Sequence, residues 1–310
     1  MPVQIPTAFA GRLRGRPADE VGGIDGDTWL ERLPQAVAGY LDEWELRPDG
    51  APWFGENALV VPVRRRTGVK AALKLTWPHA EARHEPLALR LWAGRGAVEL
   101  LAADPSAYVV LLERLDGDRD LTTVPILEAC EEIGWLFTTL DQPAPPQVDR
   151  VDVKAKRWRR QLAAHPVSVP RRLCDQARST LDGLLDDAPA PRLVHEDLHD
   201  MNVLAPLDDR RGRWVAIDPK PVAGEWAYAV APIVWNRADA ASAAHNFRTH
   251  VRLRAEVVAD AAQLDPDRVQ EWTFVRLVLN ALWAAEYGRP ADGFRGRMIA
   301  LAKAFSDPFG

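Results

Sequence analysis

The sequence has few cysteines and no long apolar run. Cys130 and Cys174 are the two cysteines among its 310 residues, and neither has the neighbours expected of a metal site. Such a pair allows a single bridge at most, which excludes a disulfide framework. No stretch of about 18 apolar residues could span a bilayer, and residues 1–17 lack the apolar core of a secretory signal. We therefore expect a protein of the reducing cytoplasm that has no contact with membranes.

The chain also lacks a strong excess of either charge. It has 39 Lys and Arg against 44 Asp and Glu, which gives a formal net charge of -5. A nucleic-acid partner is not expected, because such partners select basic surfaces. The slight negative charge favours a small cationic molecule instead. The sequence contains no internal repeat, and its 47% hydrophobic content is that of an ordinary globular protein, which we expect to be a monomer.

The hydrophobic pattern of the N-terminal part predicts a mixed α/β lobe. Residues 1–25, rich in Gly, Arg and Pro, are expected to be loose. Apolar residues at helical spacing from Trp29 to Trp44 predict an amphipathic helix. Short apolar runs separated by turns then predict the order β-β-β-α-β-β up to residue 115. We therefore predict a first lobe of residues 1–115 that consists of an antiparallel sheet and helices.

Beyond residue 115 the pattern is mainly helical, which predicts a second lobe of residues 116–310. Short strands are expected around residues 202–204 and 213–217, on either side of a polar turn. Apolar residues recur at helical spacing through most of the rest. The expected helices cover residues 126–140, 151–163, 171–186, 238–262, 266–287 and 292–305.

One polar stretch of the second lobe combines residue types that serve phosphate chemistry. His195-x-Asp197-Leu198-x-x-x-Asn202 has the spacing of the kinase catalytic loop. Phosphoryl transfer needs a carboxylate at the attacking hydroxyl and hard oxygen ligands for Mg²⁺. We assign the first role to Asp197, and the second to Asn202 and to Asp218, which follows the apolar strand WVAI. His195 is expected to brace the loop, whereas His199 fits a bracing role and a substrate contact equally well.

The first lobe contains the complementary nucleotide-binding pattern. Lys74 is expected at the end of an apolar strand, and Glu85 in the helix that follows. In kinases a strand lysine holds the phosphates of ATP, and a helix glutamate orients it. Glu113 and Leu115 fall where a hinge would offer backbone groups to adenine. Each residue alone has an ordinary structural interpretation, but their order along the chain favours a kinase.

A family resemblance rests on two stretches, LVHEDLHDMNVL and WVAIDPKPVAGEWAYAVAPIV. They resemble the aminoglycoside and hydroxyurea antibiotic-resistance kinases, in which an Asp-Pro-Lys triplet replaces the DFG motif of protein kinases. Similar stretches near both ends extend the resemblance to about residues 27–305. It implies an α+β, two-lobed, protein-kinase-like fold of the aminoglycoside phosphotransferase type, with ATP in the cleft between the lobes.

The resemblance implies a function as well. The chain would use ATP and Mg²⁺ to phosphorylate a hydroxyl of a small cationic acceptor such as streptomycin, and so give antibiotic resistance. A guanidinium pairs well with a carboxylate, so acids near the catalytic loop and on the last helices are candidates to bind this acceptor. They are Glu196, Asp200, Glu225 and Glu286.

The chain departs from the family pattern at three places. Glu196 stands where the family commonly has glycine or an aromatic residue, and an extra carboxylate there is expected on the substrate side of the loop. Ala229 stands where an aspartate is usual after Tyr228. The glycine-rich nucleotide loop is reduced to Gly55-Glu56-Asn57, which we expect to form a tight turn.

Two other functions fit the same residues. A kinase for an amino sugar or a choline-like alcohol would use the same catalytic groups, because the acceptor pocket alone distinguishes it. A nucleotide-binding regulatory pseudokinase would keep the fold without turnover, but the presence of all the core residues disfavours it. A phosphorylation screen with streptomycin, other aminoglycosides, amino sugars and hydroxyurea would separate these possibilities.

Overall fold

The computed structural model describes residues 3–208, 211–287 and 291–307, leaving out the side chain at position 287. The chain separates into two compact units, Met1–Gly117 with Ala205–Val215, and Asp118–Leu204 with Ala216–Gly310. The sequence placed residues 205–215 in the C-terminal lobe, but they cluster with the first unit. Arg211 explains the difference, because its guanidinium donates hydrogen bonds to the main-chain oxygens of Gly94 and Ala97 at 2.5 and 3.2 Å.

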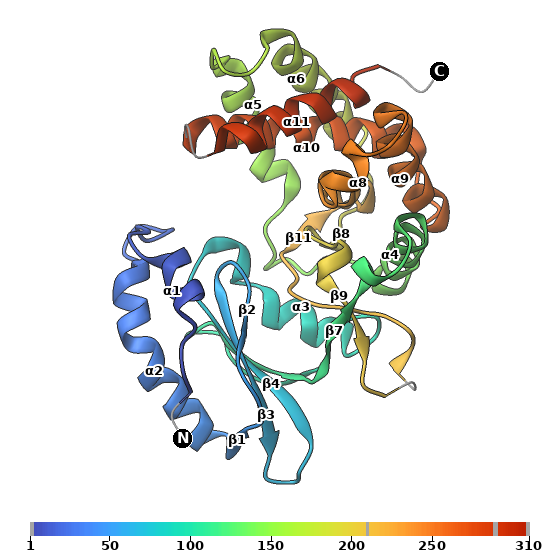
Figure 1. Cartoon of the computed structure of the whole chain (residues 1–310). Helices are drawn as coiled ribbons and strands as arrows, with labels where there is room; N and C mark the ends of the chain where they lie inside the picture. Colours follow the sequence, from blue (N-terminus) through green and yellow to red (C-terminus); the bar gives the residue numbers. More distant parts are fainter. Residues whose placement is uncertain (1–2, 209–210, 288–290, 308–310) are drawn as a thin grey trace. The chain divides into compact units, whose positions relative to one another are not determined.

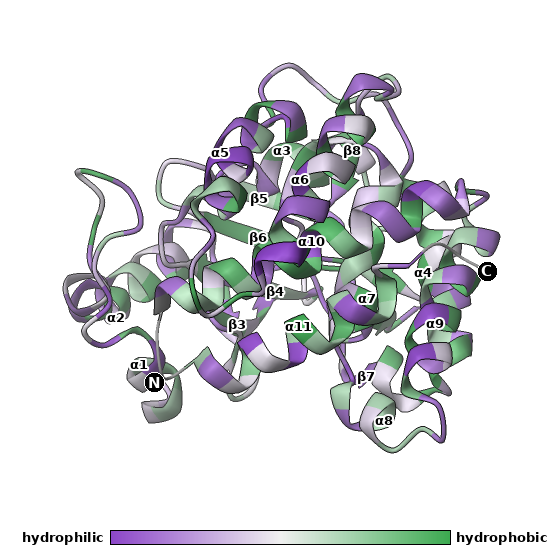
Figure 2. Ribbon diagram, turned by 90° about the horizontal axis from the view of Figure 1, so that it is seen from above, coloured by the Kyte–Doolittle hydropathy of each residue, from purple (hydrophilic) through white to green (hydrophobic). Residues whose placement is uncertain are grey.

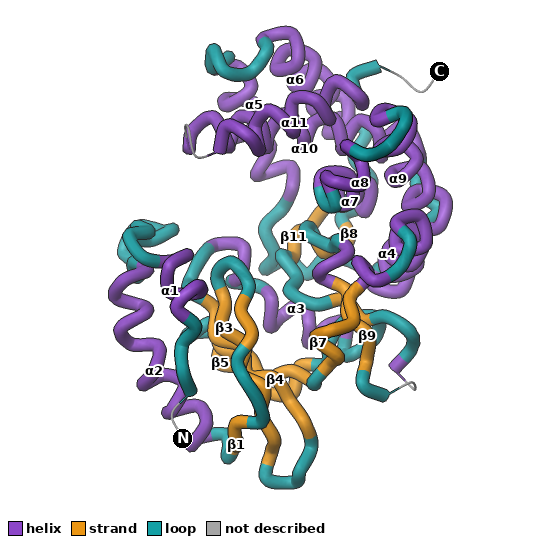
Figure 3. Tube along the Cα trace, in the orientation of Figure 1, coloured by secondary structure: helices purple, strands orange, loops and turns teal. Residues whose placement is uncertain are grey.

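An antiparallel sheet forms the centre of the first unit (Figures 1 and 3). Its strand order is β1-β3-β4-β6-β5, and β2 pairs with the N-terminal part of β3, at Leu59 and Val60. A tight turn at Gly68, where φ is 84°, joins β3 to β4 and sets Lys74 opposite Val60. The strands are β1 (Leu46–Pro48), β2 (Trp53–Phe54), β3 (Ala58–Arg65), β4 (Lys70–Thr76), β5 (Leu100–Asp104) and β6 (Val109–Glu113).

Two helices cover one face of this sheet. The helix α2 (Gly26–Glu43) is amphipathic, as its alternating colours in Figure 2 show, and its Leu33 packs against alternate side chains of β3 and β4. The helix α1 (Thr7–Leu13) was not expected from the sequence. Phe9 and Leu13 anchor it, because both side chains are fully buried in the same core.

The opposite face of the sheet carries the residues of the nucleotide-binding pattern. Side chains alternate between the two faces of a strand, so Lys74 is directed away from the core that contains its neighbours Leu73 and Leu75. The helix α3 (Glu85–Trp92) follows a short helical turn, η1 (Ala80–Ala82), and ends at Ala93, which adopts the left-handed conformation.

The second unit is helical and is built around α10 (Pro266–Tyr287), which contacts helices on several sides. Its side chains Trp272, Val275 and Val278 are all buried, as expected of a central helix. The helix expected over residues 238–262 is in fact two helices, α8 and α9. Asn246 caps the second one, because its side chain accepts a hydrogen bond from Thr249 N. The other helices are α4 (Ile126–Leu140), α5 (Val151–Ala164), α6 (Arg171–Asp186), α7 (Ala231–Trp235), α8 (Ala238–Ser242), α9 (Phe247–Ala261) and α11 (Asp292–Phe305).

Short strands and helical turns complete the fold. The strand β8 (Arg192–His195) pairs antiparallel with β11 (Pro221–Gly224), and a small sheet has the order β10-β9-β7. Its strands are β7 (Leu115–Asp120), β9 (Val203–Pro206) and β10 (Val215–Ala216), and the turns are η2 (Leu121–Thr123), η3 (Asp200–Asn202) and η5 (Trp226–Val230). No helix within the described ranges is both long and apolar enough to traverse a bilayer.

Candidate active site

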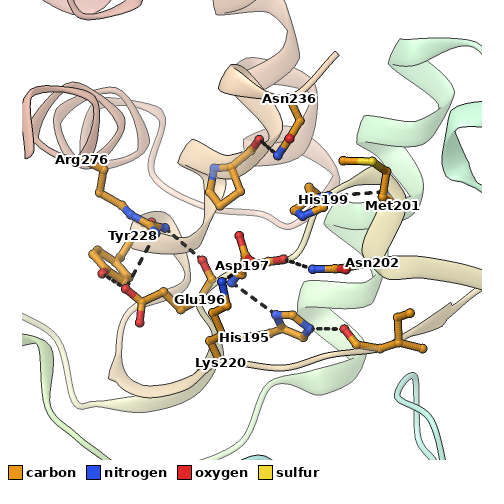
Figure 4. A network of polar contacts seen from close by, with 12 residues as sticks. His195, Glu196, Asp197, His199, Met201, Asn202, Lys220, Tyr228, Asn236 and Arg276 are labelled. Carbon is orange, nitrogen blue, oxygen red and sulfur yellow. Dashed lines mark hydrogen bonds and ion pairs between the residues drawn. The ribbon is translucent and has the colours of Figure 1, made fainter. Parts of the chain in front are cut away.

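The predicted catalytic loop, residues 195–202, leaves β8 at His195 and is bonded to residues 217–220, which follow β10. His195 lies opposite Pro221 in the β8–β11 pair, and Glu196 N donates to Lys220 O at 3.1 Å. At the other end of the loop, Ile217 N donates to Asn202 O at 2.9 Å. The backbone therefore brings residues 195–202 and 217–220 together within the second unit (Figure 4).

His195 is buried and braces the loop, as expected from the sequence. Its Nε2 donates to the main-chain oxygen of Ile217 at 2.9 Å, so Nδ1 is an acceptor and receives Asp197 N at 3.3 Å. Burial lowers the pKa of His195 to about 4 despite the Ile217 hydrogen bond and the negative charges of nearby aspartates. The imidazole is therefore neutral at pH 7 and acts through its two hydrogen bonds.

The predicted catalytic carboxylate lies beside a lysine. Asp197 Oδ2 is 2.8 Å from Lys220 Nζ, and both side chains are partly exposed. The main-chain oxygen of Asp197 accepts a hydrogen bond from Asn202 Nδ2 at 2.9 Å. Lys220 belongs to the quoted Asp-Pro-Lys triplet, but sequence reasoning assigned it no role.

The predicted metal ligands Asn202 and Asp218 fit a cation that is held only in part by protein. Within the described ranges, His, Cys, Asp and Glu side chains do not gather in groups of three or more that could enclose a metal. The hydrogen bond from Asn202 Nδ2 fixes the amide, so its Oδ1 points to the other side. Asp218 has a φ of 54°, a conformation that aspartate tolerates better than most residues. An amide and a carboxylate oxygen suit Mg²⁺, which keeps phosphate and water among its ligands.

Glu196, predicted to face the substrate, is instead enclosed by cations and an aromatic hydroxyl. Its Oε2 lies 2.7 Å from Lys154 Nζ of α5. Its Oε1 accepts the hydroxyl hydrogen of Tyr228 and lies 3.7 Å from Arg276 of α10 (Figure 4). Burial alone would raise the pKa of Glu196, but the charges of Lys154 and Arg276 outweigh it and lower the pKa to about 2. The carboxylate is therefore charged and already compensated within the second unit.

Arg276 fixes the surroundings of Glu196 through a second set of contacts. Its guanidinium donates to the main-chain oxygens of Glu196 and Tyr228 at 3.1 and 3.0 Å and lies over the rings of Tyr228 and Trp235. Trp158 stacks on Tyr228 with ring centroids 6.0 Å apart. Sequence reasoning named Tyr228 only as part of the family pattern and missed Arg276, Lys154, Trp158 and Trp235. Nothing in their local sequence separates these four from core and surface positions.

Two other predicted acceptor ligands are also engaged inside the protein. Asp200 is 2% exposed and lies 3.8 Å from Arg237, and burial raises its pKa to about 6. Glu225 receives a bidentate pair of hydrogen bonds from Arg268 at 2.7 and 2.5 Å and a third from Trp272 Nε1 at 2.6 Å. It lines a cavity of about 520 Å³ together with Asp141 and Arg192. This cavity adjoins the Arg192–Gly224 end of the β8–β11 pair, whereas His195 and Pro221 form its other end.

Glu286, the fourth predicted acceptor ligand, has a different environment. It lies on the exposed side of α10, and its Oε1 accepts a hydrogen bond from Gln161 Nε2 of α5 at 3.2 Å. Of the four acids, this one is open to solvent. The geometry therefore gives Glu196, Asp200 and Glu225 internal partners and leaves Glu286 accessible to a cationic ligand.

In the first unit, Lys74 and Glu85 form a buried ion pair. Lys74 Nζ lies 2.7 and 2.9 Å from the two carboxylate oxygens of Glu85, and the side chains are 7% and 5% exposed. The pairing of strand lysine and helix glutamate is the one that the sequence pattern describes. Lys74 does not end its strand, however, because β4 continues to Thr76.

The predicted hinge residues lie at the junction of two strands. Glu113 ends β6, and Leu115, which is buried, begins β7. The Glu113 carboxylate is held by Arg211, with contacts of 2.5 and 3.0 Å, and by Glu99 N at 2.9 Å. The Glu113 carboxylate is therefore engaged by protein groups, so the predicted contact with adenine would have to come from the backbone.

The reduced glycine-rich loop is braced by the unexpected N-terminal helix and the residues after it. Arg12 donates to Gly55 O at 3.0 Å, and Arg16 donates to Asn57 Oδ1 at 2.9 Å. Both arginines also pair with Glu56, at 3.3 and 2.5 Å. The β2–β3 turn is therefore held from outside by two cations.

Comparison with known proteins identifies the family. Residues 43–288 match the family described as aminoglycoside/hydroxyurea antibiotic resistance kinase. The chain is 37% identical over 300 residues to streptomycin 6-kinase of Streptomyces griseus, covering 93% of this chain and 94% of that protein. It is 36% identical over 294 residues to hydroxyurea phosphotransferase of Kitasatospora aureofaciens, covering 91% and 81% respectively.

A solved structure supports the fold assignment. A choline/ethanolamine kinase family protein from Mesorhizobium loti has a TM-score of 0.62 at 16% identity, over 91% of this chain and 95% of that chain. At this identity the similarity shows the fold alone, and it confirms the predicted α+β, protein-kinase-like class. The chain is therefore a small-molecule phosphotransferase that belongs to the aminoglycoside/hydroxyurea antibiotic resistance kinase family.

Proposed function

We propose that this enzyme transfers the γ-phosphate of ATP to a hydroxyl of streptomycin and thereby gives streptomycin resistance. The observation that carries the proposal is the 37% identity to a streptomycin 6-kinase, which extends over 93% of the chain. The net charge of -5 supports a small-molecule acceptor over nucleic acid, and the enzyme in this proposal is a cytoplasmic monomer.

Asp197 serves as the general base of the transfer. Its carboxylate orients the acceptor hydroxyl and takes its proton while the hydroxyl oxygen bonds to the γ-phosphorus. The bond from that phosphorus to the bridging oxygen breaks, and its electron pair leaves with ADP. This role is supported by the loop geometry, in which His195 and Asn202 each bind the backbone of Asp197. Catalysis of phosphoryl transfer depends largely on holding the reacting groups in fixed positions.

Asn202 and Asp218 hold Mg²⁺ through their side-chain oxygens. The ion, when bound, neutralises charge on the phosphates. The proposal is supported by the hydrogen bond that fixes the Asn202 amide and by the backbone bond from Ile217, the neighbour of Asp218, to Asn202. The two side chains thereby come from adjacent points of the second unit.

The first unit supplies the nucleotide contacts. Lys74 binds the α- and β-phosphates and Glu85 orients it, while the backbone at Glu113 and Leu115 meets adenine. The buried Lys74–Glu85 pair supports this role, since an isolated buried charge is unfavourable. Arg12 and Arg16 hold the β2–β3 turn in one conformation, and we assign this turn to covering the phosphates.

Hydroxyurea is the second candidate acceptor. The chain is 36% identical to a hydroxyurea phosphotransferase. Moreover, Glu196 and Glu225 already have cationic partners, which weakens the case for a cationic acceptor at those positions. If the acceptor is streptomycin, Glu286 is the acid of the four that remains accessible to one of its guanidinium groups.

The test is phosphorylation of defined acceptors by purified enzyme. We expect ATP- and Mg²⁺-dependent formation of a streptomycin monophosphate, identified by mass spectrometry, and streptomycin resistance in a sensitive bacterium that expresses the chain. The same assay is run with hydroxyurea. Phosphorylation of hydroxyurea with none of streptomycin selects the second candidate, and transfer to neither acceptor contradicts both.

A further inference from the structure

The Asp-Pro-Lys triplet places a cation at the carboxylate of Asp197. Lys220 Nζ lies 2.8 Å from Asp197 Oδ2, and its side chain is 31% exposed where that of Asp197 is 21% exposed. The two groups therefore reach solvent together instead of being sealed in the core. The neighbouring cations serve other acids, since Lys154 and Arg276 are directed at Glu196 and Arg237 at Asp200.

The backbone fixes the position of Lys220. Its main-chain oxygen accepts a hydrogen bond from Glu196 N at 3.1 Å, and the next residue, Pro221, is paired with His195 in the β8–β11 sheet. His195 in turn donates to Ile217 O, on the other side of Asp218. Lys220 is thus attached to the catalytic loop by strand pairing and by a buried histidine, which fix its main chain beside Asp197.

The negative charges of Asp197 and of the phosphoryl group give Lys220 a role in phosphoryl transfer. A general base lies about 2.6–3.2 Å from the hydroxyl whose proton it takes, and a reacting oxygen lies about 3–3.5 Å from the atom it attacks. A phosphoryl group in transfer would therefore stand within about 7 Å of the Asp197 carboxylate. Both groups are negatively charged, and their repulsion opposes the reaction. A cation that already touches the carboxylate is within reach of both.

We propose that Lys220 is a catalytic residue that bridges the Asp197 carboxylate and the transferring phosphoryl group. The inference rests on the proposed function of Asp197 as the general base. In the transfer, the acceptor oxygen bonds to the γ-phosphorus, its proton goes to Asp197, and the bond to the ADP oxygen breaks with its electron pair. The ammonium of Lys220 keeps its protons and stabilises the equatorial oxygens of the phosphoryl group while Asp197 is still charged.

The first experiment compares Lys220→Met, Lys220→Arg and a control. Loss of one preorganised donor to a transition state typically costs about 10²–10³ in kcat, and we expect a loss of this size for Lys220→Met. Because the contact is made in the transition state, affinity for a non-hydrolysable ATP analogue, measured by calorimetry, should change less than about threefold. Lys220→Arg should recover part of kcat. Lys156→Met, at an exposed lysine of α5, should behave as the parent enzyme.

A double-variant cycle separates a phosphoryl contact from simple positioning of Asp197. If Lys220 only positions the carboxylate, Lys220→Met should have no effect in an Asp197→Asn background. We expect instead a further loss of at least about tenfold in single-turnover rate, because one oxyanion donor is worth about 10²–10³. An unchanged rate in that background, or loss of analogue binding in Lys220→Met, would overturn the proposal.

The experiments distinguish a wrong acceptor assignment from a wrong role for Lys220. If the parent enzyme phosphorylates neither streptomycin nor hydroxyurea, the same variants are compared in slow hydrolysis of ATP, where water replaces the acceptor. Lys220→Met should slow this reaction as well, since the same phosphoryl group is transferred. Hydrolysis at the parent rate in Lys220→Met would contradict the role of Lys220 whatever the acceptor is.

Discussion

The side-chain amide of Asn202 donates a hydrogen bond of 2.9 Å to the main-chain oxygen of Asp197. This bond joins the residue proposed to take the acceptor proton to a residue proposed to hold the metal. Substitutions at the two positions therefore need readouts that separate proton transfer from metal binding.

Replacing Asp197 with asparagine should lower kcat by roughly 10²–10⁴, the usual value of general-base assistance. The amide keeps the size of the carboxylate but takes no proton. Affinity for ATP should stay nearly unchanged, because the proposed partner of Asp197 is the acceptor. Steady-state kinetics and calorimetry on one preparation measure both quantities. Asp186→Asn, at an exposed position of α6, is the control; a variant at Asp197 that keeps more than about a tenth of parent turnover would remove this residue from the mechanism.

Replacing Asp218 with asparagine should raise the Mg²⁺ concentration needed for half-maximal activity. We expect an increase on the order of tenfold or more, since even outer-shell partners of a metal are worth about 10–100-fold in affinity. Asn202→Ala should show the same increase together with a lower kcat at saturating Mg²⁺, because it also removes the bond to Asp197. Magnesium titrations that overlay the parent curve for both variants would contradict the metal assignment.

Breaking the Lys74–Glu85 pair should destabilise the protein as well as inactivate it. Both side chains are almost fully buried, and removal of one partner from such a pair typically costs about 3–5 kcal/mol. Lys74→Met should therefore lower the free energy of unfolding, measured with urea, by about this amount. The double variant Lys74→Met/Glu85→Leu should regain most of the stability and remain inactive.

An exposed pair of the same unit provides the control for this measurement. Arg66 and Glu45 are 3.4 Å apart with side chains 79% and 69% exposed. Arg66→Ala should change the free energy of unfolding by less than about 1 kcal/mol. Recovery of activity in the double variant would show that Lys74 serves stability and not the nucleotide.

Glu196 should make stability depend on pH in the acid range. Its pKa is lowered from 4.5 to about 2, so the folded state binds fewer protons than the unfolded state between these values. The stabilisation is complete above pH 4.5 and is lost as the pH falls toward 2. From this shift we expect a contribution on the order of 3 kcal/mol. Glu196→Gln should be less stable at pH 7 and should lose stability less steeply on acidification.

Urea titrations at several pH values measure this dependence. Glu131→Gln, at an exposed position of α4, should follow the parent curve. If the stability of Glu196→Gln falls in parallel with that of the parent between pH 4.5 and 2, Glu196 is not paired with Lys154 and Arg276 in solution.

The parts of the site that the sequence predicted are those whose geometry is local. The spacing from His195 to Asn202 occupies one short loop. Lys74 and Glu85 come from a strand and the helix that follows it, as predicted, although Lys74 does not end that strand. The family and the fold class follow from these motifs, and the comparisons confirm both.

The environments of the acids could not be predicted, because their partners come from distant helices. Glu196 meets Lys154 and Arg276, which are 42 and 80 positions away in the chain, and Glu225 meets Arg268 at a separation of 43. An acid beside a catalytic loop has the same local pattern whether it faces the acceptor or a buried guanidinium. The helix α1 was missed for a similar reason, since Phe9 and Leu13 gain their partners only from the sheet.

The attachment of residues 205–215 to the first unit has a consequence for synthesis on the ribosome. The chain leaves this unit at Gly117 and returns to it at Ala205, so the unit does not correspond to a continuous part of the gene. Until Arg211 has been translated, the carboxylate of Glu113 lacks its guanidinium partner. A nascent chain stalled before that point therefore holds an incomplete first unit, and a gene fragment that stops at residue 117 would yield the same unfinished product.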